Sequence, residues 1–176
     1  MYRQGDHLVY GSHGLCEITE IGSSPIDPND TRTYYALHPV LSAPTTMIFT
    51  PTDNTAVIMR PPMTGKQARA LLERMPEILP LSVEQEKTRR DIYRSVLSAA
   101  VPEQLVALLR TVAQRRLETL RHGRRLTDAD TDSERRAHNN LLGELSLALG
   151  LSHEETAGLI QNALTPDSER TDPAAP

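Results

Sequence analysis

The chain has 176 residues, a formal net charge of −4, 38% hydrophobic residues, 3% aromatic residues and no tryptophan. This length allows one domain or two small ones, with mainly aliphatic cores. The lone Cys16 excludes an internal disulfide and fits a reducing compartment. Neither a secretory signal nor an apolar run near the roughly 20 residues of a membrane helix is present, so we expect a cytoplasmic protein.

Charge is distributed unevenly along the chain. Residues 1–60 hold three basic and six acidic groups, a net charge of −3. Residues 87–125 hold ten basic and three acidic groups, a net charge of +7. Because polyanions respond to the local field, the acidic total does not exclude nucleic acid as a partner of this segment.

The first sixty residues predict short strands separated by turns. Gly11-Ser12-His13-Gly14 predicts a tight reversal, because glycine tolerates positive φ. The alternation of apolar and polar residues slips at Glu20-Ile21, which indicates a bulge. Five strands at this spacing favour a small antiparallel β-barrel of the Tudor or SH3 type. The predicted strands cover residues 7–10, 15–21, 33–38, 45–50 and 56–60.

After Pro61-Pro62 the pattern becomes helical. Capping boxes are predicted for the pairs Thr64/Gln67, Ser82/Gln85 and Ser152/Glu155, and Pro102 suits a first helical turn. The predicted fold class is therefore α+β in two domains, a barrel over 1–62 and an all-α domain over 63–164. Residues 165–176 are polar and rich in Pro and Ala, and we expect a disordered tail. The five predicted helices cover 64–75, 82–99, 102–122, 128–149 and 153–164.

The order of the segments is similar to that of a known family. The opening runs Gly5-Asp6-His7-Leu8-Val9-Tyr10-Gly11-Ser12-His13-Gly14-Leu15-Cys16-Glu17-Ile18, a Gly-Asp, an apolar strand, an aromatic, a His-Gly turn and a second strand. Over about residues 1–163 the chain resembles CarD/CdnL-type proteins. The later segments that carry the resemblance are Tyr34-Tyr35-Ala36-Leu37, Pro51-Thr52-Asp53-Asn54, Ile58-Met59-Arg60 and Leu141-Leu142-Gly143-Glu144-Leu145-Ser146-Leu147-Ala148.

The resemblance implies a non-enzymatic bacterial transcription regulator. It implies a Tudor-like barrel that binds the RNA polymerase β subunit by adding a strand to a sheet edge. It also implies a helical domain that meets promoter DNA near the upstream edge of the transcription bubble and alters open-complex stability. Strand addition suits such an anchor, because main-chain hydrogen bonds give affinity while alternate side chains give specificity.

The expected polymerase-binding strand is Thr46, Met47, Ile48, Phe49 and Thr50. Phe49 is the only phenylalanine of the chain, and some relatives carry a basic residue at its position. The alternative is that Met47 and Phe49 belong to the barrel core.

Arginines carry the expected DNA contact, which would be weak and sequence-tolerant because forked Arg donors match phosphate oxygens. The resemblance places a tryptophan wedge where this chain has Glu86, so we expect the wedge to be missing and open complexes to be held more weakly. Aspartates at 128, 130 and 132 weaken part of the basic surface. The candidate DNA-binding residues are Lys87, Arg89, Arg90, Arg94 and Arg136.

Two alternatives stay open for the helical half. The arginines can form an ordinary solvated face with intrahelical ion pairs. The whole chain can then be a protein-interaction adaptor, bound to polymerase or another partner without significant DNA binding. We expect no cofactor, metal or small-molecule substrate, because the histidines are dispersed and no acid–base or nucleophile arrangement is found. The Asp128–Asp132 repeat lacks the Gly and Glu of a calcium loop and suits a helix start.

Overall fold

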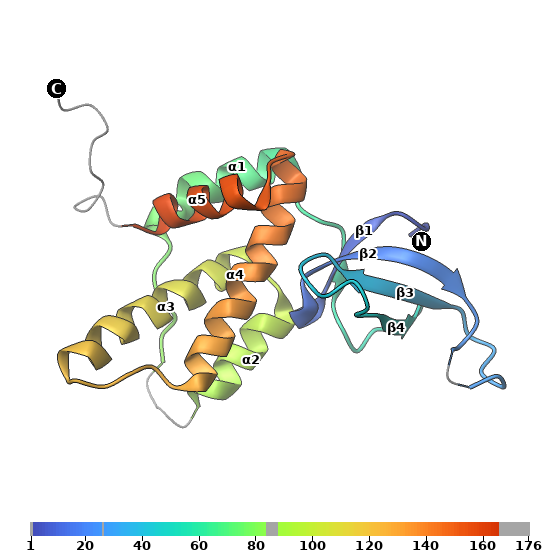
Figure 1. Cartoon of the computed structure of the whole chain (residues 1–176), viewed down its shortest axis with the longest axis horizontal. Coiled ribbons are helices and arrows are strands. Elements are labelled where there is room, and N and C mark those ends of the chain that lie inside the picture. The colour runs from blue at the N-terminus through green and yellow to red at the C-terminus, as the bar shows by residue number, and fades with distance from the viewer. Residues whose placement is uncertain (1, 26, 84–87, 166–176) are drawn as a thin grey trace.

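The computed structural model describes residues 2–25, 27–83 and 88–165. An N-terminal antiparallel sheet is followed by five α-helices, which confirms the predicted α+β class (Figure 1). The predicted boundary at residues 62 and 63 falls between the last strand and the first helix, and the division into domains stays a prediction. The N-terminal elements are β1 (His7–Tyr10), the 3-10 turn η1 (Gly11–His13), β2 (Leu15–Gly22), β3 (Tyr34–Pro39), β4 (Ile48–Pro51) and β5 (Met59–Arg60).

The strands form one sheet in the order β4-β3-β2-β1-β5, with each pair antiparallel. The sheet curls, so that the Tyr10 hydroxyl on β1 reaches Thr50 Oγ1 on β4 and donates a hydrogen bond to it at 3.1 Å. Within the described residues no ladder joins β4 to β5, so the predicted closed barrel is not confirmed. The register shifts between Ile18 and Glu20, slightly before the predicted bulge.

The inner face of the sheet buries a small core. Its residues follow the alternation that the sequence showed, because successive strand side chains point to opposite faces. The core residues are Leu8, Tyr10, Cys16, Ile18, Tyr35 and Leu37.

The helical half begins at a confirmed capping box. Thr64 Oγ1 accepts a hydrogen bond from the Gln67 amide, and the Gln67 side chain accepts from the Thr64 amide. Ser152 and Glu155 form the same motif at the last helix, and Pro102 opens the third helix as predicted. The elements are α1 (Gly65–Arg74), the 3-10 turn η2 (Met75–Glu77), α2 (Arg89–Ala99), α3 (Pro102–Arg121), α4 (Asp128–Leu149) and α5 (His153–Leu164).

One predicted helix start is wrong. Ser82 and Val83 are not helical, and α2 begins only at Arg89. Gln85, the second half of the predicted capping box, lies outside the described residues. The motif Ser-x-x-Gln predicts a helix start, but Ser82 and Val83 instead belong to the irregular segment after η2.

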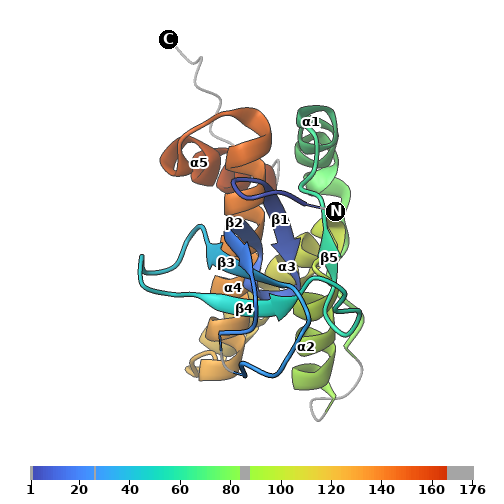
Figure 2. The ribbon, with the colours of Figure 1, turned by 90° about the vertical axis from the view of Figure 1, so that its right-hand side faces the viewer.

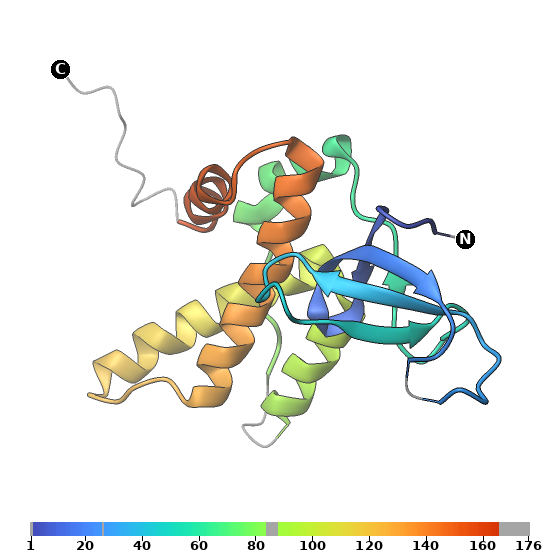
Figure 3. The same ribbon diagram turned by 45° about the vertical axis from the view of Figure 1, so that its right-hand side comes forward.

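Helices α4 and α2 both lie against the N-terminal sheet, and α3 lies on the far side of α4 (Figures 1 and 3). Leucines at helical spacing on α3 and α4, such as Leu105, Leu108, Leu141 and Leu145, form the buried centre of the helical half. None of the described helices is both long enough and apolar enough to span a membrane. Most of the predicted tail, residues 166–176, lies outside the described residues.

Candidate polymerase-binding and DNA-binding surfaces

Strand β4 stands at one edge of the sheet and pairs only with β3 (Figure 2). Thr50 points into the core and is 1% exposed, whereas Phe49 is 43% exposed and Met47 is 39% exposed. The interpretation of Met47 and Phe49 as core residues is therefore wrong. An edge strand with exposed apolar side chains offers unpaired main-chain groups together with contact surface, which another strand can use.

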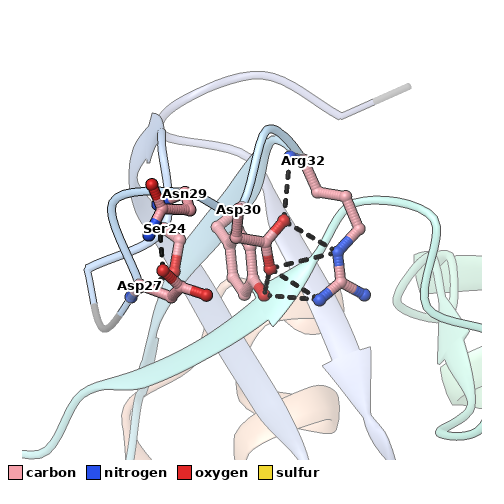
Figure 4. Close-up of polar contacts among 6 residues, drawn as sticks. Ser24, Asp27, Asn29, Asp30 and Arg32 are labelled. Atoms are coloured by element: carbon pink, nitrogen blue, oxygen red, sulfur yellow. Dashed lines mark hydrogen bonds and ion pairs between the residues drawn. The ribbon is translucent and has the colours of Figure 1, made fainter.

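An ordered polar loop borders this edge (Figure 4). Tyr34, which faces Pro51 of β4 in the ladder, donates its hydroxyl to Asp30 at 2.8 Å, and Arg32 donates to the same carboxylate at 2.6 Å. Hydrogen bonds from Arg32 hold the pKa of Asp30 well below its ordinary value, so Asp30 is ionised at neutral pH. This cluster was not predicted from the sequence, in which the spacing of Asp30, Arg32 and Tyr34 is only a weak signal.

The opposite edge of the sheet is tied to the helices. Arg60 of β5 donates to both carboxylate oxygens of Glu144 on α4, at 2.6 and 2.8 Å, and to the carbonyl oxygen of Ala100 at 2.7 Å. Glu144 is 2% exposed and also accepts a hydrogen bond from the Met63 amide at 2.7 Å. This forked ion pair fixes the sheet relative to α2 and α4.

The Gly-Ser-His-Gly turn forms a second point of close contact. A Cβ atom on Gly14, at φ +72°, would lie 2.4 Å from Oδ1 of Asn140 on α4, and one on Gly11 would lie 2.9 Å from Val57. Both glycines are therefore needed for close approach as well as for backbone conformation. The predicted reversal is thus also a junction between the sheet and the helices.

Three of the candidate DNA-binding residues share one cleft. Arg90 and Arg94 of α2 and Arg136 of α4 line a hollow of about 290 Å³, and Ser12 of the η1 turn lines it as well. All three arginine side chains are exposed. Lys87 and Glu86, the predicted DNA contact and the residue at the wedge position, lie outside the described residues.

Arg89 does not belong to that surface, and its burial argues against the predicted DNA contact. Its side chain is buried, with Nε 2.9 Å from Asp130 Oδ1. Asp130 is also the third residue of a capping box with Thr127 at the start of α4, which the sequence analysis did not recognise. One buried carboxylate therefore joins α2 to α4, and Arg115 of α3 lies 3.7 Å from it.

The acidic start of α4 contributes one carboxylate to the cleft. Asp132 pairs with Arg135 at 2.6 Å and with Arg136 at 2.7 Å. The hydrogen bond from Arg135 lowers the pKa of Asp132, and the charge of Arg136 adds to this effect. Since Asp130 is buried against Arg89, Asp132 is the aspartate that offsets the basic charge of the cleft.

The remaining arginines of residues 87–125 fall into two groups, those bonded within the fold and those exposed near the end of α3. Arg110 donates to the carbonyl oxygens of Met75 and Pro76 and so fastens η2 to α3, while Arg116 pairs with Glu134. The end of α3 and the segment that follows it expose further arginines together with two leucines, each 61% exposed. These exposed residues are Leu117, Leu120, Arg121, Arg124 and Arg125.

Comparison with protein families matches the sheet. The family model described as CarD-like/TRCF RID domain matches residues 2–63, which span β1 to β5 and the connection to α1. A comparison with curated proteins finds no significant match. The matched domain is of a non-catalytic type that interacts with RNA polymerase. Residues 2–63 therefore match the CarD-like/TRCF RID domain, a finding that is consistent with a CarD-like protein.

Proposed function

We propose that this protein is a bacterial, cytoplasmic transcription regulator that binds the RNA polymerase β subunit and contacts promoter DNA near the upstream bubble edge. In this role it modulates the stability of the open complex and associates with the nucleoid through polymerase. The observation that carries the proposal is the exposed edge strand β4 within a CarD-like/TRCF RID domain.

Strand β4 and the residues before it supply the polymerase contact, from Thr46 to Thr50. A polymerase strand added beside β4 forms main-chain hydrogen bonds, and Met47 and Phe49 lie where they can pack against its side chains. Thr50 supports the strand from within, because its side chain is buried against Tyr10.

Arg90, Arg94 and Arg136 supply the DNA contact, with Lys87 as a further candidate. Their exposed guanidinium groups suit phosphate oxygens and carry no base-reading pattern, so the contact is sequence-tolerant. Arg89 does not contact the DNA in this proposal; its buried ion pair with Asp130 joins α2 to α4, the two helices that carry these arginines.

The test of the polymerase contact is binding of the full chain to the isolated polymerase β lobe, with Phe49→Asp as the variant. The matched control is Ile58→Asp, which changes another exposed apolar residue, 48% exposed, near the opposite edge of the same sheet. We expect Phe49→Asp to abolish binding and Ile58→Asp to retain it. Absence of binding by the unmodified chain, or equal loss in both variants, would refute the assignment of β4.

A second candidate is an adaptor that binds polymerase or another partner without significant DNA contact. The pairing of Asp132 with Arg135 and Arg136 favours it, because these arginines already have an anionic partner. Duplex binding that weakens steeply with added salt would separate the regulator from the adaptor, since phosphate contacts release counterions.

A further inference from the structure

The cleft between α2 and α4 is completed by the sheet. Its walls come from Arg90, Arg94 and Ser98 of α2 and from the first turns of α4, and Ser12 of the RID domain closes it. Because Gly14 allows the η1 turn to approach Asn140 of α4 closely, the position of Ser12 is set by the junction between sheet and helices. The residues at this cleft are therefore brought together only when both parts of the chain are folded and packed.

Cationic groups exceed anionic groups in the cleft. Three arginines line it against one carboxylate, Asp132. Within the described residues Arg90 forms no ion pair, and Arg94 reaches only Asp91, at 3.4 Å between two well-exposed side chains. Arg136 shares Asp132 with Arg135, so one carboxylate is divided between two guanidinium groups.

Hydroxyl groups add neutral donors. The Ser12 and Ser98 hydroxyls make no hydrogen bond within the part of the chain that the structure describes, whereas the Ser133 hydroxyl donates to the Ala129 carbonyl oxygen at 2.7 Å. Excess guanidinium charge with open hydroxyl donors is the chemistry that binds a phosphate oxyanion.

We propose that this cleft is a phosphate-binding site, in which Ser12 of the RID domain joins Arg90, Arg94 and Arg136 as a ligand-contacting residue. The phosphate belongs to a duplex DNA backbone or to a free oligophosphate, which share the same oxyanion chemistry. The duplex case rests on the DNA contact of the proposed function and extends it, because the polymerase-binding domain itself then touches DNA. Phosphate occupancy would consequently favour the packed arrangement of sheet and helices.

The test is duplex binding by the full chain at several salt concentrations, with Ser12→Glu as the variant. Ser23→Glu is the matched control, because it adds the same charge at an exposed position in the β2–β3 loop. We expect Ser12→Glu to weaken binding about tenfold through like-charge repulsion. We also expect it to lower the salt slope, because the added carboxylate offsets part of the cationic charge that displaces counterions from the phosphates.

A second pair of variants, each of which removes one positive charge, tests the proposal even if Ser12→Glu does not fold. Arg94→Gln lies in the cleft, and Arg121→Gln removes the same charge from an exposed position at the end of α3. We expect Arg94→Gln to weaken duplex binding more than Arg121→Gln. Equal effects within both matched pairs, in variants with native circular dichroism, would overturn the proposal in favour of a diffuse basic surface.

Tripolyphosphate distinguishes the two sources of phosphate. Duplex binding without tripolyphosphate binding supports the site with the DNA backbone as its ligand. Tripolyphosphate binding that is lost in Ser12→Glu supports it with a free oligophosphate. Binding of neither overturns the site. Polymerase β-lobe binding, measured in parallel, shows separately whether the anchoring function of β4 holds.

Discussion

One edge of the sheet is exposed, and the other edge is in contact with the helices. At the β4 edge, Phe49 and Met47 are exposed and the outer side of the strand has no partner strand among the described residues. At the β5 edge, Arg60 forms a forked ion pair with the buried Glu144 of α4. Figure 2 shows the sheet with β4 along one side and β5 along the other, beside α1.

This difference shows how a small sheet can be fixed to the helices at one edge and remain open to a partner strand at the other. An edge strand is a hazard because its free main-chain groups invite further pairing. In this chain one edge is covered by the contact with the helices, and the other edge is left for a partner. Substitutions at β5 and at the η1 turn should therefore alter stability, whereas substitutions at β4 should alter binding.

The largest expected effect comes from the ion pair at the β5 edge. Glu144→Ala leaves the Arg60 guanidinium and the Met63 amide without their carboxylate, and breaking a buried pair in this way costs roughly 3–5 kcal/mol of unfolding free energy. Urea unfolding followed by circular dichroism measures the loss. The control is Glu103→Ala, whose exposed pair with Arg74 contributes about 0–1 kcal/mol. Equal losses in both variants would show that the junction does not depend on Glu144.

A smaller loss is expected at the η1 turn. Gly14→Ala places a Cβ atom against Asn140 and destabilises the fold by about 1–3 kcal/mol beyond the cost of positive φ. Gly5→Ala is the reference variant, because Gly5 also has positive φ but has open space around it. Thermal unfolding of the two variants gives the difference. If they unfold at the same temperature, the close contact with α4 is unimportant.

At the free edge we expect almost no change in stability. Phe49→Asp should leave the unfolding free energy within about 0.5 kcal/mol of its original value, because Phe49 is an exposed surface residue. The same urea titration provides the measurement. A loss comparable to that of Glu144→Ala would mean that Phe49 supports the fold, and it would remove the contrast between the edges.

The thiol of Cys16, buried in the sheet core, is expected to react slowly with disulfide reagents. Burial raises the pKa of Cys16 to about 12, so the reactive thiolate is scarce at pH 8 and its access is blocked. A disulfide reagent should modify the folded chain far more slowly than the chain in urea, and the rate reports opening of the sheet. Glu144→Ala should accelerate the reaction if the β5 junction restrains the sheet, and an unchanged rate would show that it does not.

Local patterns in the sequence determined most of the elements. Helices α4 and α5 begin and end where the sequence predicts, because leucine periodicity and, at α5, the capping box are properties of neighbouring residues. Strand β4 lies at an edge as expected, but it covers Ile48–Pro51, so only Ile48 to Thr50 of the predicted strand belong to it. Its binding to polymerase stays a prediction.

Tertiary structure alone decided which charged residues face solvent. Arg89 and Arg90 are adjacent in the sequence, yet one is buried against Asp130 and the other lines the cleft, because successive helical residues point in different directions. Glu144 lies within a leucine-rich segment and becomes a buried partner of Arg60, 84 residues earlier in the chain. Such pairings depend on packing between distant segments, which local periodicity does not encode. For the same reason the sequence identified Gly11-Ser12-His13-Gly14 as a turn, and only the folded chain showed that it joins the sheet to the helices.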